Sequence, residues 1–68
     1  MTVATAFTRL FRQPDGQRVL AHLKHITQER VLAPDAQNAE LWFLEGQRAM
    51  VALIVALINQ GQQEGDIK

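Results

Sequence analysis

Ten consecutive apolar residues, Ala49–Ile58 (AMVALIVALI), lie in the second half of a chain of only 68 residues. A helix that faces water on one side carries its apolar residues along a stripe, with polar residues opposite. This segment has no polar side, so nearly its whole circumference needs cover. A domain of this size buries only about 60% of the surface that its unfolded chain exposes. We therefore expect another copy or another protein to supply part of that cover.

The means by which so small a domain is stabilised are limited. Such domains usually depend on disulfides, metals, oligomerisation or tight helix packing. The chain has no cysteine, which excludes disulfides and thiolate zinc sites and is compatible with a reducing cytoplasm. No secretory signal is recognisable, and the apolar decamer is shorter than the roughly 20 residues that span a bilayer. We expect a soluble protein with no membrane partner.

The spacing of apolar residues predicts three helices and no strand. The first helix runs from Val3 to about Arg12, with its apolar side chains on one face. Pro14 disfavours helix in the residue before it and is well tolerated in the first turn of a following helix. It therefore marks a break and a restart. The second helix runs from about residue 15 to 28, with an apolar stripe at Val19, Leu20, Leu23 and Ile26.

A second break, at residues 33–35, precedes the longest helix, which we expect from about residue 36 to 60. Asp35 is a suitable N-cap, and Gly61 would follow the helix as its C-terminal glycine. The predicted fold class is all-α, with two short N-terminal helices packed on one long C-terminal helix. These helices form a single domain over residues 1–61, followed by a flexible polar tail over residues 62–68.

The long helix carries two apolar seams, and the two predicted N-terminal helices are short enough that they can cover only one of them. The first seam follows a 3-4 spacing and contains Phe43, Gly46, Met50, Leu53 and Leu57. Covering four or five exposed side chains contributes on the order of 1.5–3 kcal/mol each before association costs. We expect the second, offset side to be an interface between copies; the alternative is that the short helices wrap both seams. This predicted interface contains Leu44, Val51, Ile54, Val55 and Ile58.

Four residues of the long helix have candidate special roles. Gly46 costs about 1 kcal/mol against alanine in a helix interior, so it either admits a close neighbour or is a tolerated surface glycine. The candidate neighbours are Phe7, Phe11 or Trp42 of the partner subunit. Glu45 and Arg48 are spaced to pair on the helix surface, in a structural or interface role. Trp42 is either a core residue or an interface anchor.

The chemistry of metal binding and catalysis has little support in the sequence. His22 and His25 share a helix face with Glu29 and could hold a metal, but a closed site needs three or four ligands. Solvent-facing histidines are the favoured interpretation. No phosphate-binding glycine loop, Ser–His–Asp arrangement or cysteine nucleophile is recognisable. We predict no enzymatic activity, no catalytic residue, no metal and no cofactor.

The seven basic and seven acidic residues cancel but are unevenly distributed. Residues 1–34 carry five basic side chains against two acidic ones, and residues 35–68 carry two against five. Antiparallel packing of the halves, or of neighbouring copies, would use these opposite signs. The basic half also leaves open a nucleic-acid-binding or regulatory protein, which salt-dependent DNA binding would reveal. Its basic residues are Arg9, Arg12, Arg18, Lys24 and Arg30.

The order of short motifs resembles a known group of proteins. The motifs are Phe-x-x-Leu-Phe, Asp-Gly-x-x-Val-Leu-x-x-Leu and Glu-Gly-x-Arg, at residues 7–11, 15–23 and 45–48. Over about residues 5–58 the chain resembles small helical proteins encoded in the head and DNA-packaging gene modules of tailed bacteriophages. The resemblance implies a phage or prophage gene and makes Glu45, Gly46 and Arg48 a signature turn. It also implies a place in the host cytoplasm or the virion, with other phage structural proteins as partners.

The sequence therefore predicts a non-enzymatic interaction or assembly protein that self-associates through its long apolar helix. A small nucleic-acid-binding or regulatory protein that uses the basic N-terminal half is the alternative.

Overall fold

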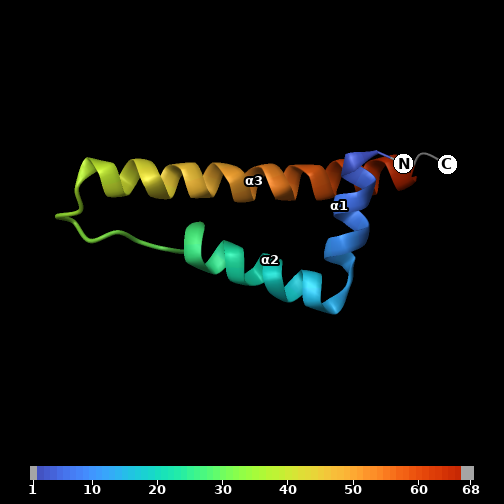
Figure 1. The fold of residues 1–68 in the computed structure, drawn as a ribbon, viewed down its shortest axis with the longest axis horizontal. Coiled ribbons are helices and arrows are strands. Elements are labelled where there is room, and N and C mark those ends of the chain that lie inside the picture. Colours follow the sequence, from blue (N-terminus) through green and yellow to red (C-terminus); the bar gives the residue numbers. More distant parts are fainter. Residues whose placement is uncertain (1, 67–68) are drawn as a thin grey trace.

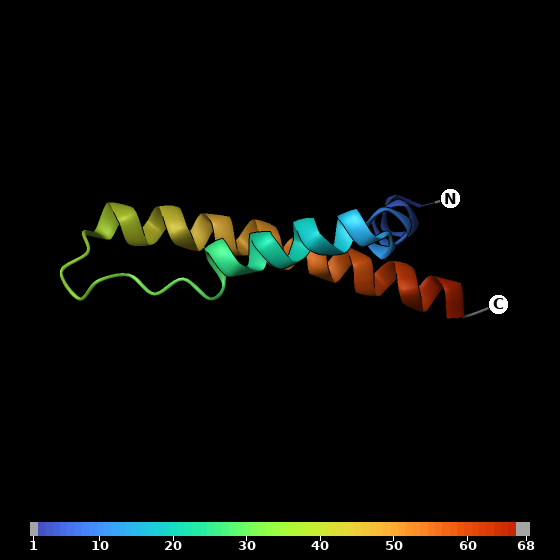
Figure 2. The same cartoon turned by 90° about the horizontal axis from the view of Figure 1, so that it is seen from below.

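The computed structural model describes residues 2–66 and contains three helices: α1 (Val3–Arg12), α2 (Pro14–Thr27) and α3 (Asn38–Asp66). α3 runs along nearly the whole molecule, α1 crosses it near its C-terminal end, and α2 returns along it (Figures 1 and 2). The chain is elongated, with extents of 51 × 20 × 14 Å. The predicted all-α arrangement, with two short helices on one long one, is confirmed.

The break between the first two helices occurs where proline requires it. Thr2 caps α1 by accepting a hydrogen bond from the backbone N–H of Thr5 at 3.1 Å. Gln13 leaves the helical conformation, with φ −68° and ψ 151°, because the ring of Pro14 disfavours helix in the preceding residue. α2 then begins on that proline, which lacks the N–H that a first turn leaves unpaired.

A loop joins α2 to α3 and delays the start of the long helix. The carbonyl of Ala33 accepts a hydrogen bond from the N–H of Ala36 at 2.9 Å, which closes a turn around Pro34 and Asp35. α3 therefore begins at Asn38 rather than at residue 36. The prediction that Asp35 caps the helix is wrong, because that residue belongs to the preceding turn.

The core is small and lies where the short helices meet α3. Its fully buried apolar residues are Ala4 of α1 and Leu44 and Val51 of α3, which are 2%, 1% and 4% exposed. Thr8 and Thr27 are also buried. Their hydroxyl groups are satisfied by carbonyl oxygens of their own helices, Ala4 at 3.1 Å and Leu23 at 2.6 Å, so the burial of these polar groups costs little.

Gly61 lies where α1 crosses α3, and it is part of the helix rather than its end. A Cβ at this position would overlap the side chain of Thr8 and the carbonyl of Ala4. The hydroxyl of Thr8 also lies 2.8 Å from the carbonyl oxygen of Ile58, which joins the two helices at the crossing. The absence of a side chain at Gly61 therefore lets α1 approach the backbone of α3 directly.

The predicted end of the long helix at Gln60 is therefore wrong. Gly61 has no positive φ and does not act as a terminating glycine, and α3 continues to Asp66. Most of the predicted polar tail, residues 62–66, is helical; residues 67–68 lie outside the described part of the chain. Packing of α1 on this last part of α3 supplies the stabilisation that the local sequence lacks.

Replacing Gly61 by alanine is expected to destabilise the fold by about 1–3 kcal/mol, because the new methyl group overpacks the crossing. Gly46→Ala, measured at concentrations where the chain is monomeric, is the matched control, since a Cβ there meets nothing of its own chain within 4 Å and alanine gains about 1 kcal/mol of helix propensity. Urea denaturation of the two variants measures the difference. Equal stabilisation by both substitutions would contradict the close crossing.

Glu64 fastens the start of α1 to the end of α3. One of its carboxylate oxygens accepts hydrogen bonds from the hydroxyl of Thr2 at 2.6 Å and from that of Thr5 at 3.2 Å. Its other oxygen accepts one from the side-chain amide of Gln60 at 3.3 Å. The Thr2 hydrogen bond is the largest cause of a lowered pKa of Glu64, from an ordinary value of 4.5, because it stabilises the charged form.

The lowered pKa makes the stability that Glu64 contributes through these hydrogen bonds depend on pH. A group whose pKa is lower in the folded state contributes stability above its unfolded pKa and loses that contribution as pH falls through the folded pKa. Thermal melts from neutral pH downwards are expected to show a loss of stability below about pH 4.5. The Glu64→Gln variant, in which this group does not titrate, should show a smaller loss. An identical loss of thermal stability at acidic pH in the two proteins would refute this role of Glu64.

Candidate functional site: an uncovered face of the long helix

One face of α3 leaves large apolar side chains in contact with water. Trp42 is 72% exposed, Phe43 68%, Met50 58% and Leu53 52%. At 3.6 residues per turn these four positions and Gly46 fall within about a third of the helix circumference. We call these five residues the uncovered face. Monomeric soluble proteins rarely expose a contiguous apolar patch of this kind unless it binds something.

The structure covers the seam that was predicted to face another copy and leaves most of the other seam exposed. Leu44 and Val51 are buried against the chain's own short helices, and Ile54, Val55 and Ile58 are partly buried. The residues predicted as the interface between copies therefore lie mainly on the internal side. Both seams are apolar, so hydropathy alone did not distinguish them. Contacts of α1 at Gly61 and of α2 at Arg48 determine which one is covered.

Gly46 has open space around it. No atom of the chain lies within 4 Å of where its Cβ would be, so the expected close approach of Phe7 or Phe11 is wrong. These two rings instead stack on each other within α1, with centroids 6.2 Å apart and an interplanar angle of 14°. The approach of Trp42 of the partner subunit stays a prediction. In the single chain Gly46 is an exposed gap in the uncovered face.

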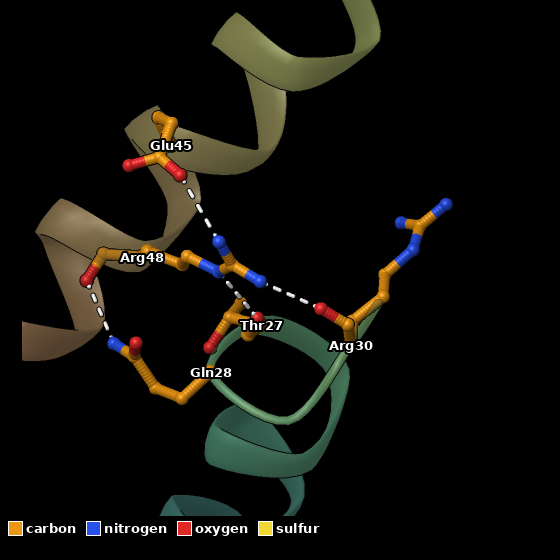
Figure 3. A network of polar contacts seen from close by, with 5 residues as sticks. All are labelled: Thr27, Gln28, Arg30, Glu45 and Arg48. Carbon is orange, nitrogen blue, oxygen red and sulfur yellow. Dashed lines mark hydrogen bonds and ion pairs between the residues drawn. The ribbon is translucent and has the colours of Figure 1, made fainter. Parts of the chain in front are cut away.

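Arg48 lies on the covered side of α3 and holds the end of α2 (Figure 3). Its Nε donates to the carbonyl of Thr27 at 2.9 Å, and its two terminal nitrogens donate to the carbonyl of Arg30 at 2.6 Å and to Glu45 at 3.0 Å. In return, the side-chain amide of Gln28 donates to the carbonyl of Arg48 at 3.0 Å. We call these contacts the Arg48 clamp.

The clamp satisfies backbone groups that a helix end leaves unpaired. The last carbonyls of α2 have no partner within the helix, and the guanidinium provides donors in a fixed fork that suits several acceptors at once. The predicted pairing of Glu45 with Arg48 is present at 3.0 Å. The sequence did not reveal the backbone acceptors, because an arginine pairing with a carboxylate four positions or fewer away looks like a surface ion pair.

An open cleft of about 370 Å³ lies where the loop meets the start of α3. Its walls are apolar apart from one positive and one negative side chain. The lining residues are Arg30, Leu32, Ala39, Glu40 and Phe43. Because Phe43 also belongs to the uncovered face, the cleft extends that face towards the N-terminal end of α3.

The histidines and the basic side chains of the described chain do not come together in a metal site or a single basic surface. His25 Nδ1 lies 3.6 Å from Glu29 with both side chains exposed, and His22 is exposed. Within residues 2–66 no three His, Asp or Glu side chains are placed to hold one metal ion. The five basic side chains of residues 1–34 are exposed and distributed over α1, α2 and the loop.

The long helix also has the length and composition of a membrane span. Residues Asn38–Glu64 meet that test, and only 11% of the most apolar window is buried. The core helix of a soluble protein meets the same test but is mostly buried. The low burial therefore again identifies α3 as a helix whose apolar surface the rest of the chain leaves uncovered. The prediction of no membrane partner stays a prediction.

The fold and the uncovered face define a small three-helix protein with an apolar helix available for contact. A family model described as Bbp19-like phage protein matches residues 7–63, which is most of the chain. The protein therefore belongs to the Bbp19-like phage protein family, and the resemblance to small phage proteins is confirmed. No curated protein and no solved structure gives a significant match.

Replacing Arg48 by methionine is expected to lower the free energy of unfolding by about 1–3 kcal/mol, since carbonyl groups lose charged hydrogen-bond donors. Amide hydrogen exchange should accelerate in the last turn of α2 and in the loop. Arg18→Met, at an exposed position of α2, serves as the control for the loss of one positive charge. Equal effects of the two substitutions would contradict the clamp.

Proposed function

We propose that the protein is a non-enzymatic interaction or assembly protein, encoded by a phage or prophage, that self-associates through α3. The uncovered face is the observation that carries the proposal. Its four large apolar side chains are each more than half exposed. Aromatic side chains of this kind dominate binding energies at protein interfaces. The proposed places of action are the host cytoplasm and the virion, where other phage structural proteins are further partners.

The size of the uncovered face is sufficient for a pair of copies. Two aromatic and two aliphatic side chains at these exposures present on the order of 500 Å² of apolar surface per copy. Two copies therefore bury about 1,000 Å², the lower limit for a biological interface. The face is also chemically suited to a copy of itself, since its five residues carry no charge and no charge would be left unpaired when they are buried.

Self-association predicts a concentration-dependent mass in sedimentation velocity, and Leu53→Gln should weaken it by about tenfold or more. The substitution removes apolar burial from both copies of the pair. Val19→Gln is the matched control, because Val19 of α2 is 51% exposed and Leu53 is 52% exposed. It should leave the association unchanged.

A chain that remains monomeric at high concentration would refute the proposal. Equal weakening by Leu53→Gln and Val19→Gln would also refute the assignment to α3, since it would indicate unspecific aggregation. Circular dichroism of both variants verifies that the helices are retained.

A further inference from the structure

The first seam of α3, most of which belongs to the uncovered face, has the periodicity of a two-helix coiled coil. Its residues follow spacings of 3, 4, 3 and 4, which is the heptad pattern that presents two positions per seven to a facing helix. Four of them are exposed or partly exposed apolar side chains, and the fifth is a glycine with open space around it. These residues are Phe43, Gly46, Met50, Leu53 and Leu57.

The glycine distinguishes between the two possible orientations of a pair. In a parallel pair each residue faces its own copy, so Gly46 would face another glycine and leave an unfilled layer between Phe43 and Met50. Such voids lose packing contacts and cost stability.

An antiparallel pair fills the same layer. When the helices are centred on residue 48, Gly46 faces Met50 of the partner subunit, and Phe43 faces Leu53 of the partner subunit. Trp42, beside the seam, then lies over Ala56 of the partner subunit. Each large side chain faces a smaller one, which is the alternation that lets facing layers interlock.

The cleft at the start of α3 supports the same register. Ala39 and Phe43 form part of its wall, and in the antiparallel pair Leu57 of the partner subunit lies opposite Ala39. The cleft then receives an apolar side chain at each end of the pair. In the parallel pair Ala39 faces Ala39 of the partner subunit, so no large side chain lies opposite the cleft.

We propose that α3 pairs with α3 of a second copy in antiparallel orientation, with Gly46 of each copy receiving Met50 of the partner subunit. This inference rests on the proposed self-association and adds its orientation and register. The pairing is isologous, as most dimers of identical chains are.

Single cysteines introduced into this cysteine-free chain test the orientation. Ala39, Ala49 and Ala56 are exposed alanines, and each Ala→Cys substitution is small. In the proposed pair the two copies of residue 49 lie close to the two-fold axis, whereas the copies of residue 39 are about 27 Å apart along the helix. A short thiol-specific cross-linker should therefore join Ala49→Cys chains but not Ala39→Cys or Ala56→Cys chains.

A mixture of Ala39→Cys and Leu57→Cys chains should yield the mixed cross-linked pair in preference to either homodimer. Cross-linking of Ala39→Cys or Ala56→Cys chains to themselves as efficiently as Ala49→Cys would overturn the antiparallel orientation. A dimer in sedimentation velocity in which Ala49→Cys fails to cross-link would overturn the register while leaving self-association intact.

Failure of the proposed function is recognisable separately. A chain that is monomeric in sedimentation and cross-links at none of the three positions lacks self-association altogether. Flotation of that monomer with vesicles of neutral phosphatidylcholine would then assign the uncovered face to lipid instead of a second copy, and would overturn both proposals.

Discussion

The close crossing of α1 over α3 is the contact on which the rest of the structure depends. It requires a position without a side chain at Gly61 and a small residue at Ala4, and the hydroxyl of Thr8 joins the two backbones there. Once α1 is held at this end of α3, the proline after it directs α2 back along the same side. The second seam of α3 is then covered and the first is left facing water.

The Arg48 clamp completes this arrangement at the other end of α2. A single guanidinium binds two backbone carbonyls and a carboxylate, so the C-terminal end of α2 is held to α3 by polar contacts. Few apolar residues are fully buried in the described chain. Covering the remaining face with a second copy would therefore add a large share of the protein's total apolar burial.

Local signals in the sequence were sufficient for much of the fold. The first two helices follow from apolar spacing and from Pro14, whose backbone restrictions act within a few residues. The end of α3 could not be predicted in this way, because Gly61 looks like a terminator unless the approach of α1 is known. The choice between the two seams failed for a similar reason: Leu44 and Phe43 are equally apolar, and only tertiary contacts separate them.

The Arg48 clamp also affects which residues are free to vary. Its guanidinium contacts main-chain oxygens of residues 27 and 30, not their side chains, and every amino acid offers the same oxygen. The side chain of Arg30 could therefore change over evolution without loosening the contact, whereas Arg48 could not. Variation across the family should accordingly be tolerated in this loop and restricted at the single position of α3 that holds it.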